Sequence, residues 1–255
     1  MLSVQNLSKS FGGVQATRDV SIDFPTGSLS AIIGPNGAGK TTFFNLISGA
    51  FRPDAGRVIL NGTDIVGMSS LEVVRRGMAR AFQVAALFPT LTVREALTAA
   101  VISYRRRSWT LLRRFPLEDT EWRVAEILNL LTLGAKADTL SRNLSHGDQK
   151  LLDIALALAM EPQVLLLDEP TAGMGPEERW RMILQVQNLW QATGMTVLFI
   201  EHDMDIVFRI AQAIYVLKYG QVLARGTADE IRTNQDVIDA YLGTDHGLAA
   251  LAGAA

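Results

Sequence analysis

One loop indicates the architecture of this chain: it reads Gly34-Pro35-Asn36-Gly37-Ala38-Gly39-Lys40-Thr41. It matches the pattern G-x-x-x-x-G-K-S/T, follows the apolar run Leu29–Ile33 and precedes a helix predicted near Thr41–Ser48. Glycines let the backbone curl so that several N–H groups face one anion, and the helix directs the positive end of its dipole to the same place. A glycine-rich turn with a surface lysine is the alternative, but a strand, loop and helix in this order favour a phosphate cradle.

The polar residues of this loop have predicted roles with a nucleotide. Lys40 is expected to bridge the β- and γ-phosphates, Thr41 to bind Mg²⁺ through its hydroxyl, and Thr42 to contact the α-phosphate. The other nucleotide contacts are predicted from Gly34, Asn36, Gly37, Ala38 and Gly39.

Two acids follow a second apolar run. Val164–Leu167 is typical of a parallel strand covered on both faces, and Asp168 and Glu169 come directly after it. Ligands of open α/β sheets bind at the carboxyl ends of strands, so these acids and the loop can converge on one nucleotide. We predict that Asp168 holds Mg²⁺ and that Glu169 polarises the attacking water, a role worth about 10²–10⁴-fold in rate. The alternative is a pair of solvated strand-end acids, which the phosphate cradle disfavours.

A third apolar run, Thr196–Ile200, ends in Glu201-His202-Asp203. A single histidine is more often a surface residue than a ligand. Its place at the end of another predicted strand favours a hydrogen bond from His202 to the γ-phosphate, and hence a part in catalysis.

The remaining pattern predicts a mixed α/β core that contains a helical lobe. Arg57–Leu60 followed by Asn61-Gly62 favours a hairpin at a sheet edge. From about residue 85 to residue 140 the periodicity becomes helical. Further helices are predicted over 150–160 and over Pro176–Ala192, the second ending at Gly194.

Composition excludes several classes of protein. Of the 255 residues, 48% are hydrophobic and 20% are charged, which predicts a packed core. The net charge of -2 gives no strong attraction to nucleic acid or anionic lipid, and the absence of cysteine excludes disulfides and thiolate chemistry. We expect neither a secretory signal nor a membrane-spanning segment, and therefore a cytoplasmic protein.

The segment Leu144-Ser145-His146-Gly147-Asp148-Gln149 identifies a family. It resembles the signature motif, usually Leu-Ser-Gly-Gly-Gln, of ATP-binding cassette (ABC) proteins. The phosphate cradle before it and the strand-end acids after it match the order of motifs in that family. Within the resemblance, Gln83 looks like the Q-loop glutamine, which contacts nucleotide and Mg²⁺, and Phe11 looks like the adenine-stacking aromatic. Thr171–Met174 looks like the D-loop, and His202 looks like the switch histidine.

The resemblance covers residues 1–243 and implies a P-loop NTPase (RecA-like) α/β core. An N-terminal antiparallel β subdomain and an inserted α-helical subdomain are implied as well. It places the core in residues 1–84 and 160–243, the helical subdomain with its signature motif in 85–159, and a flexible tail in 244–255.

The resemblance also implies a mechanism that needs two chains. ATP and Mg²⁺ are the implied cofactors, and Ser145 with the N–H of Gly147 binds the γ-phosphate of the partner's ATP, at the start of a helix. His146 and Asp148 depart from the usual signature, and Gly175 stands at the D-loop aspartate position. Ser145 and Gly147 are retained, so we expect phosphate binding between chains to survive.

The variant motifs resemble those of importer subunits for branched-chain amino acids, and those of urea and short-amide importers are very similar. The segments involved are Arg80–Gln83, Leu87-Phe88, Ser145–Gly147, Ala172–Met174, Glu201–Met204 and Ala240–Gly243. The implied partners are a second ATPase chain, identical or paralogous, two membrane-spanning permease subunits and, indirectly, an extracytoplasmic solute-binding protein. A peripheral position on the inner face of the cell membrane follows from those partners.

Two other functions compete with transport. ABC-type ATPases that act on DNA or ribosomes usually carry long coiled coils or two cassettes, for which this chain has no room. A non-catalytic nucleotide-binding regulator would lack the catalytic base, yet Glu169 is present.

A basic stretch remains outside these motifs. It comprises Tyr104–Trp109, with Arg105–Arg107, and Arg113–Phe115. A solvated helical face is the simpler interpretation. Contact with anionic lipid or with a permease is the sharper hypothesis, since such segments gain about 1 kcal/mol per charge beside a membrane.

Overall fold

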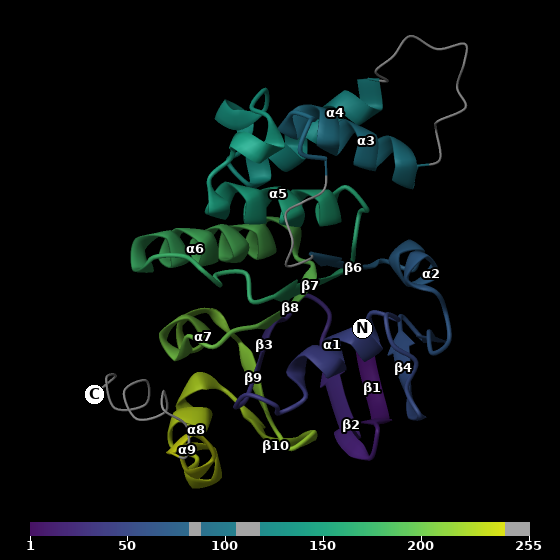
Figure 1. The fold of residues 1–255 in the computed structure, drawn as a ribbon, viewed down its shortest axis with the longest axis vertical. Helices are drawn as coiled ribbons and strands as arrows, with labels where there is room; N and C mark the ends of the chain where they lie inside the picture. Colours follow the sequence, from purple (N-terminus) through teal and green to yellow (C-terminus); the bar gives the residue numbers. More distant parts are fainter. Residues whose placement is uncertain (82–87, 106–117, 243–255) are drawn as a thin grey trace.

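The computed structural model describes residues 1–81, 88–105 and 118–242. Within these ranges the chain forms two sheets flanked by helices (Figure 1). The antiparallel sheet has the order β2-β1-β4-β5. Its strands are β1 (Leu2–Phe11), β2 (Val14–Phe24), β4 (Ala55–Leu60) and β5 (Thr63–Asp64). The predicted hairpin is the β4–β5 pair, although β5 forms the edge while β4 also pairs with β1.

The second sheet has the order β10-β9-β3-β8-β7-β6. Its strands are β3 (Leu29–Ile33), β6 (Met78–Ala81), β7 (Val164–Asp168), β8 (Thr196–Ile200), β9 (Ala213–Lys218) and β10 (Gln221–Gly226). All pairings are parallel except that of β9 with β10. The three apolar runs predicted as buried strands are β3, β7 and β8, which adjoin, so their carboxyl ends meet at one edge.

The faces of this parallel sheet pack into two separate cores. Leu165 and Leu167 of β7 belong to one hydrophobic cluster, whereas Val164 and Leu166 belong to the other. The same alternation holds for β3, β8 and β9, because successive side chains of a strand point to opposite faces. Each strand is therefore covered on both sides, which explains its continuous apolar sequence.

Different helices cover these two faces. The helices are α1 (Lys40–Ile47), α2 (Ser70–Arg75), α3 (Val93–Tyr104), α4 (Glu118–Leu130), α5 (His146–Leu158), α6 (Pro176–Thr193), α7 (Met204–Ile210), α8 (Ala228–Arg232) and α9 (Gln235–Leu242), with 3₁₀ turns η1 (Gly134–Lys136) and η2 (Ser141–Asn143). Helix α1 buries Phe43 and Phe44 in the cluster shared with the antiparallel sheet. Helices α5, α6 and α7 pack in the other cluster. Fully burying a phenylalanine side chain stabilises the fold by about 1.5–3 kcal/mol, so α1 is firmly anchored.

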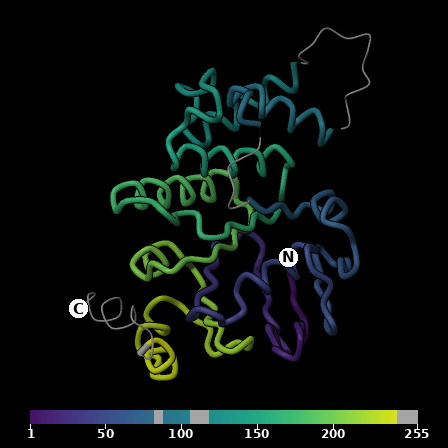
Figure 2. Tube along the Cα trace, viewed as in Figure 1, coloured from purple at the N-terminus to yellow at the C-terminus, as the bar shows by residue number. Residues whose placement is uncertain are grey.

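The chain leaves the core after β6 and returns to it at β7. Between these strands α3, α4 and α5 pack together in the upper part of Figure 1. Figure 2 follows the same path from the purple and blue core through the teal helices to the green and yellow strands. The predicted helical region between two parts of an α/β core is confirmed in this respect.

Helix ends follow the predicted signals, with one extension. Gly194 ends α6 in the left-handed conformation, and Pro176 occupies the first turn. Helix α5 starts at His146, earlier than the predicted 150–160 segment, because the Ser145 hydroxyl accepts a hydrogen bond from the N–H of Asp148 and caps it.

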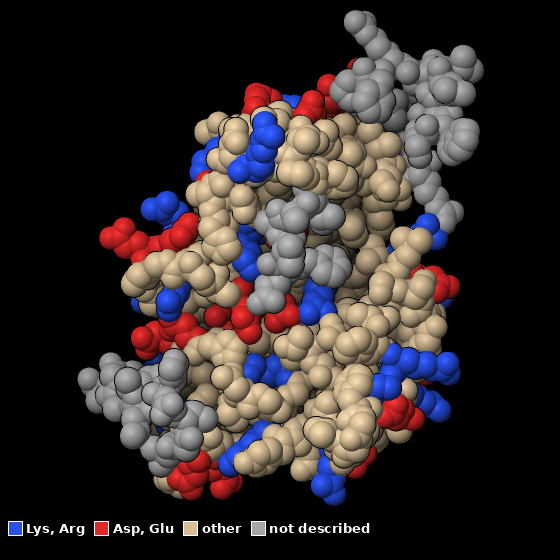
Figure 3. Space-filling view, viewed as in Figure 1, with Lys and Arg blue, Asp and Glu red and all other residues tan. Residues whose placement is uncertain are grey.

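Two surface properties bear on partners. In the parts of the chain that the structure describes, none of the helices has the length and apolar character needed to cross a bilayer. Figure 3 shows acidic and basic side chains interspersed over the visible face, in keeping with the small net charge.

Candidate functional site

The phosphate loop lies between β3 and α1, where two glycines allow close packing. A Cβ at Gly34 would lie 2.1 Å from the carbonyl oxygen of Leu217, and one at Gly39 would lie 2.2 Å from that of Ala16. Gly39 precedes α1 with φ 99°, in the left-handed region. The first N–H groups of an α-helix have no partner within the helix, so the start of α1 is suited to an anion.

Lys40 holds its ammonium group over this loop. Its Nζ donates hydrogen bonds to the carbonyl oxygens of Gly34 at 2.7 Å and Pro35 at 3.1 Å. Burial lowers the pKa of Lys40, while the negative charges of Glu169 and Asp168 oppose that shift. Lys40 is only 7% exposed. Its present hydrogen-bond partners are neutral carbonyl oxygens, which phosphate oxygens can replace.

An open cavity of about 290 Å³ adjoins the loop. It brings together most of the predicted nucleotide contacts with both predicted catalytic residues. Its lining comprises Val14, Gln15, Ala16, Asn36, Gly37, Ala38, Gly39, Lys40, Thr41, Thr42, Glu169 and His202.

Asp168 ends β7 in a buried ion pair that the sequence did not indicate. Its Oδ2 accepts a hydrogen bond from Arg80 of β6 at 2.6 Å, and Arg80 also donates to Asn45 Oδ1 of α1 at 2.6 Å. Arg80 and Asp168 are 13% and 6% exposed. The guanidinium group therefore fixes the carboxylate from one side and connects three core elements.

Glu169 and His202 meet across the ends of neighbouring strands. Glu169 Oε1 and His202 Nε2 are 3.0 Å apart. The N–H of Glu169 donates to the carbonyl oxygen of Ile200 at 3.0 Å, and the residue adopts φ 48°. A non-glycine residue in this region is uncommon and carries some strain, which is typical of functional sites.

Glu201 is a further residue of this edge that sequence reasoning named only as the neighbour of His202. Its buried carboxylate accepts hydrogen bonds from the N–H and the hydroxyl of Thr171 at 2.9 and 2.7 Å, and from the N–H of His202 at 3.2 Å. Burial raises the pKa of Glu201, and these hydrogen bonds oppose the shift. An acid directly after a buried strand was the signal available in the sequence.

The signature residues belong to the opposite face of the sheet. Ser145 caps α5 and Gly147 lies in its first turn. Helix α5 packs in the cluster opposite to that of α1, and neither residue lines the cavity beside Lys40. One chain therefore does not bring Lys40 and Ser145 to the same phosphate.

Phe11 and Gln83 stay predictions. The Phe11 ring is 44% exposed and packs edge-on against Phe51 at a centroid distance of 5.6 Å, while β2 residues line the cavity. Gln83 lies outside the described residues.

The donors present fit Mg²⁺. Asp168 and Thr41 offer oxygen atoms, and within residues 1–81, 88–105 and 118–242 there is no group of three or more His, Cys, Asp or Glu residues that could hold a metal. Mg²⁺ in nucleotide sites takes one or two carboxylates and completes its shell with substrate phosphates and water.

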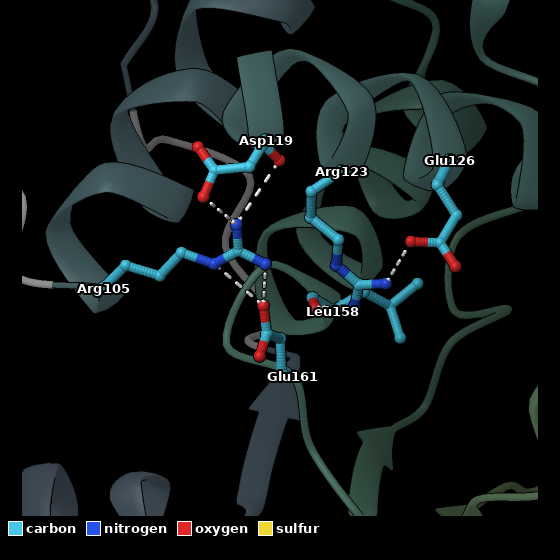
Figure 4. A network of polar contacts seen from close by, with 6 residues as sticks. All are labelled: Arg105, Asp119, Arg123, Glu126, Leu158 and Glu161. Carbon is cyan, nitrogen blue, oxygen red and sulfur yellow. Dashed lines mark hydrogen bonds and ion pairs between the residues drawn. The ribbon is translucent and has the colours of Figure 1, made fainter. Parts of the chain in front are cut away.

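The start of the basic stretch has intramolecular partners. Arg105 forms an ion pair with Glu161 and another with Asp119 at 3.4 Å (Figure 4). Arg123 beside it donates to Glu126 and to the carbonyl oxygen of Leu158. Arg105 therefore connects α3 and α4 to the segment before β7, while residues 106–117 lie outside the described ranges.

A phosphate loop at the end of β3 and acids at the end of β7 define the class of P-loop nucleoside triphosphatases. The family model for the ABC transporter matches residues 17–172, and that for the branched-chain amino acid ATP-binding cassette transporter matches residues 221–247. The chain therefore belongs to the ABC transporter family, as an ATPase subunit coupled to transport.

Relatives and solved structures agree with this assignment. The high-affinity branched-chain amino acid transport ATP-binding protein LivG of Escherichia coli (strain K12) is 37% identical over 95% of this chain and 98% of its own length. A nucleotide-free ATP-binding cassette from an ABC transporter superposes with a TM-score of 0.83 at 31% identity, covering 96% of this chain and 99% of that one. A bacterial ABC transporter cassette described as dimeric has a TM-score of 0.75 at 26% identity, covering 89% and 99%. The predicted family and the ABC ATPase fold are confirmed.

Proposed function

We propose that this chain hydrolyses ATP to power import of branched-chain amino acids or a related small solute, as one of two cassettes in a transporter. The similarity to LivG and the match at residues 221–247 support the solute class. The observation that carries the two-chain mechanism is the placement of α1 and α5 on opposite faces of the sheet. A γ-phosphate bound by Ser145 would then belong to the nucleotide of another chain.

The residues of the cavity divide the work. Lys40 and the loop N–H groups hold the phosphates, and Phe11 stacks on the adenine. Glu169 orients and polarises the attacking water, and His202, 3.0 Å from Glu169, contacts the γ-phosphate. Bound Mg²⁺, held by Asp168, Thr41 and Gln83, would neutralise charge on the β- and γ-phosphates.

Closure of the pair follows from the same arrangement. Ser145 and the N–H of Gly147 bind the γ-phosphate of the ATP that lies on the partner's Lys40, so two ATP molecules join two chains head to tail. Loss of the γ-phosphate removes this link and reopens the pair. The dimeric solved relative supports this proposal.

The proposed assembly places the chain against a membrane. Two permease subunits form the pathway, an extracytoplasmic binding protein delivers the solute, and the chain lies peripherally on the cytoplasmic face. In this proposal residues 1–243 act as a single ATPase domain, with 85–159 as its signature-bearing lobe.

Glu169→Gln tests the proposal. The variant should bind ATP but lose about 10²–10⁴-fold in hydrolysis, because the amide cannot accept a proton from water. It should therefore accumulate an ATP-bound dimer, measured by light scattering on a sizing column. Glu177→Gln, which removes an exposed acid from α6, is the control and should hydrolyse normally. A Glu169→Gln chain that stays monomeric in saturating ATP would count against the mechanism.

A further inference from the structure

The signature loop is proposed to bind phosphate through two donors, and Glu178 already accepts a hydrogen bond from one of them. The N–H of Gly147 donates a hydrogen bond to Glu178 Oε1 at 3.1 Å. Glu178 lies in the first turn of α6. A Cβ at Gly147 would come within 2.3 Å of that oxygen, so the close approach of the carboxylate depends on glycine.

Asp148 accepts a hydrogen bond from the other donor, the hydroxyl of Ser145. The Ser145 hydroxyl donates to Asp148 Oδ2 at 2.6 Å, and Lys136 of η1 forms an ion pair with the same oxygen. Burial raises the pKa of Asp148, but the hydrogen bonds from Lys136 and Ser145 outweigh burial and lower it overall. Asp148 is therefore ionised at neutral pH.

Each contact competes with phosphate. A serine hydroxyl has one proton to donate, so Ser145 cannot serve Asp148 and a phosphate oxygen at once. The N–H of Gly147 is likewise engaged by Glu178. Two negative carboxylates also repel an incoming anion. The positive end of the α5 dipole stabilises these carboxylates, as it would otherwise stabilise a phosphate.

A third contact holds this arrangement together. His146 Nε2 lies 3.1 Å from the carbonyl oxygen of Ala172, between the catalytic acids and α6. The first turn of α5 thus contacts the D-loop through His146 and the first turn of α6 through Gly147. Movement of α6 relative to α5 would separate Glu178 from Gly147.

We propose that Glu178 and Asp148 stand in for the partner's γ-phosphate on the signature loop of the unpaired chain and thereby set the ATP concentration at which two chains close. The proposal rests on the proposed function, since it concerns the same trans contact. Both acids are positioning residues: they control the signature groups and do not touch the reacting atoms.

Dimer formation in a Glu169→Gln background tests this directly. Adding Glu178→Gln removes the negative charge at nearly constant size, and the ATP concentration for half-maximal pairing should fall about five-fold, as one charge at a helix start implies. Asp148→Gln should act in the same direction. Adding Glu177→Gln instead removes the same charge from the same turn of α6, where the side chain is exposed, and should leave pairing unchanged.

A purely structural role gives the opposite result. If Glu178 only fastened α6 to α5, its loss would lower the melting temperature and raise the ATP requirement. Pairing equal to that of the Glu177→Gln control, or weaker, would overturn the proposal.

A second measurement does not need pairing. With ADP saturating the phosphate loop, inorganic phosphate is titrated into the monomer while the amide resonance of Gly147 is followed by NMR. The shift should saturate at lower phosphate in Glu178→Gln than in wild type, and an unchanged titration would contradict the proposal. If Glu169→Gln alone does not pair in ATP, the proposed function fails. The phosphate titration still decides whether Glu178 competes with phosphate for the N–H of Gly147.

Discussion

The two regions of this chain that are proposed to bind phosphate differ in what occupies them. In the loop after β3, Lys40 donates to the neutral carbonyl oxygens of Gly34 and Pro35, which a phosphate replaces without repulsion. At the start of α5, Ser145 and Gly147 are engaged by the carboxylates of Asp148 and Glu178. The first region is prepared for nucleotide, whereas the second must first lose its acidic partners.

This difference suggests an order of events. A single chain can take ATP on its phosphate loop, because the cavity beside Lys40 is open. The signature loop is available only after the contacts at α6 and the D-loop change. Binding and closure are thus separate steps, and variants should affect them separately.

The largest effect on ATP binding is expected at the phosphate loop, Gly34–Thr41. Lys40→Ala removes the buried ammonium group from the cavity and should weaken ATP binding by about 10²-fold or more, on the scale of other preorganised phosphate and oxyanion contacts. Equilibrium binding of a fluorescent ATP analogue to the monomer measures it. Lys218→Ala removes the same charge from the end of β9, outside the cavity lining, and should bind normally. Equal affinities would refute the role given to Lys40.

Arg80→Met tests how much the buried ion pair between Arg80 and Asp168 stabilises the fold. The change leaves Asp168 buried without its cation, which should lower the free energy of unfolding by about 3 kcal/mol. Arg94→Met breaks an ion pair whose members are 50% and 84% exposed, and should cost less than about 1 kcal/mol. Urea unfolding of both variants gives the comparison. If both variants lost similar free energy of unfolding, the Arg80 ion pair would stabilise the fold no more than an exposed ion pair does.

Asp153→Asn probes a buried acid on α5, the helix that carries the signature loop. Burial raises the pKa of Asp153 to about 6, and Oδ2 has no hydrogen-bond partner. The folded chain then binds this proton more tightly than the unfolded chain does, so wild type should lose stability as pH rises from about 4 to about 6.

The Asp153→Asn variant should be more stable than wild type by about 1–3 kcal/mol at pH 8 and nearly equal to it at pH 4. Thermal unfolding across this range measures the difference. Asp138→Asn, which removes the same charge from an exposed position, is the control. A difference between Asp153→Asn and wild type that grows toward low pH would contradict the assigned cause.

The strands that lead into the phosphate loop and the switch histidine could be predicted from the sequence because their signals are local. Leu29–Ile33 and Thr196–Ile200 are apolar runs that become buried strands with the predicted bounds. Residues placed directly after such runs share one edge of the sheet, and this shared edge places Glu169 beside His202.

Other contacts could not be predicted because they join distant segments without a local pattern. Arg80 and Asp168 are 88 positions apart, and Gly147 and Glu178 are 31 apart. Asp148 was visible as a departure from the usual signature, but its bond to Ser145 follows from the capping geometry of α5. Which acid meets which donor depends on tertiary packing.

The central claim is that each nucleotide site combines Lys40 of one chain with Ser145 of the other. Mixing two defective chains tests it, both in the Glu169→Gln background: one carries Lys40→Ala and the other carries Ser145→Arg. In a head-to-tail heterodimer of these chains, one site keeps both residues and the other loses both. We predict that each variant alone retains no ATP after rapid gel filtration, whereas the mixture retains about one ATP per heterodimer. A mixture that retains no more ATP than the separate variants would contradict the account.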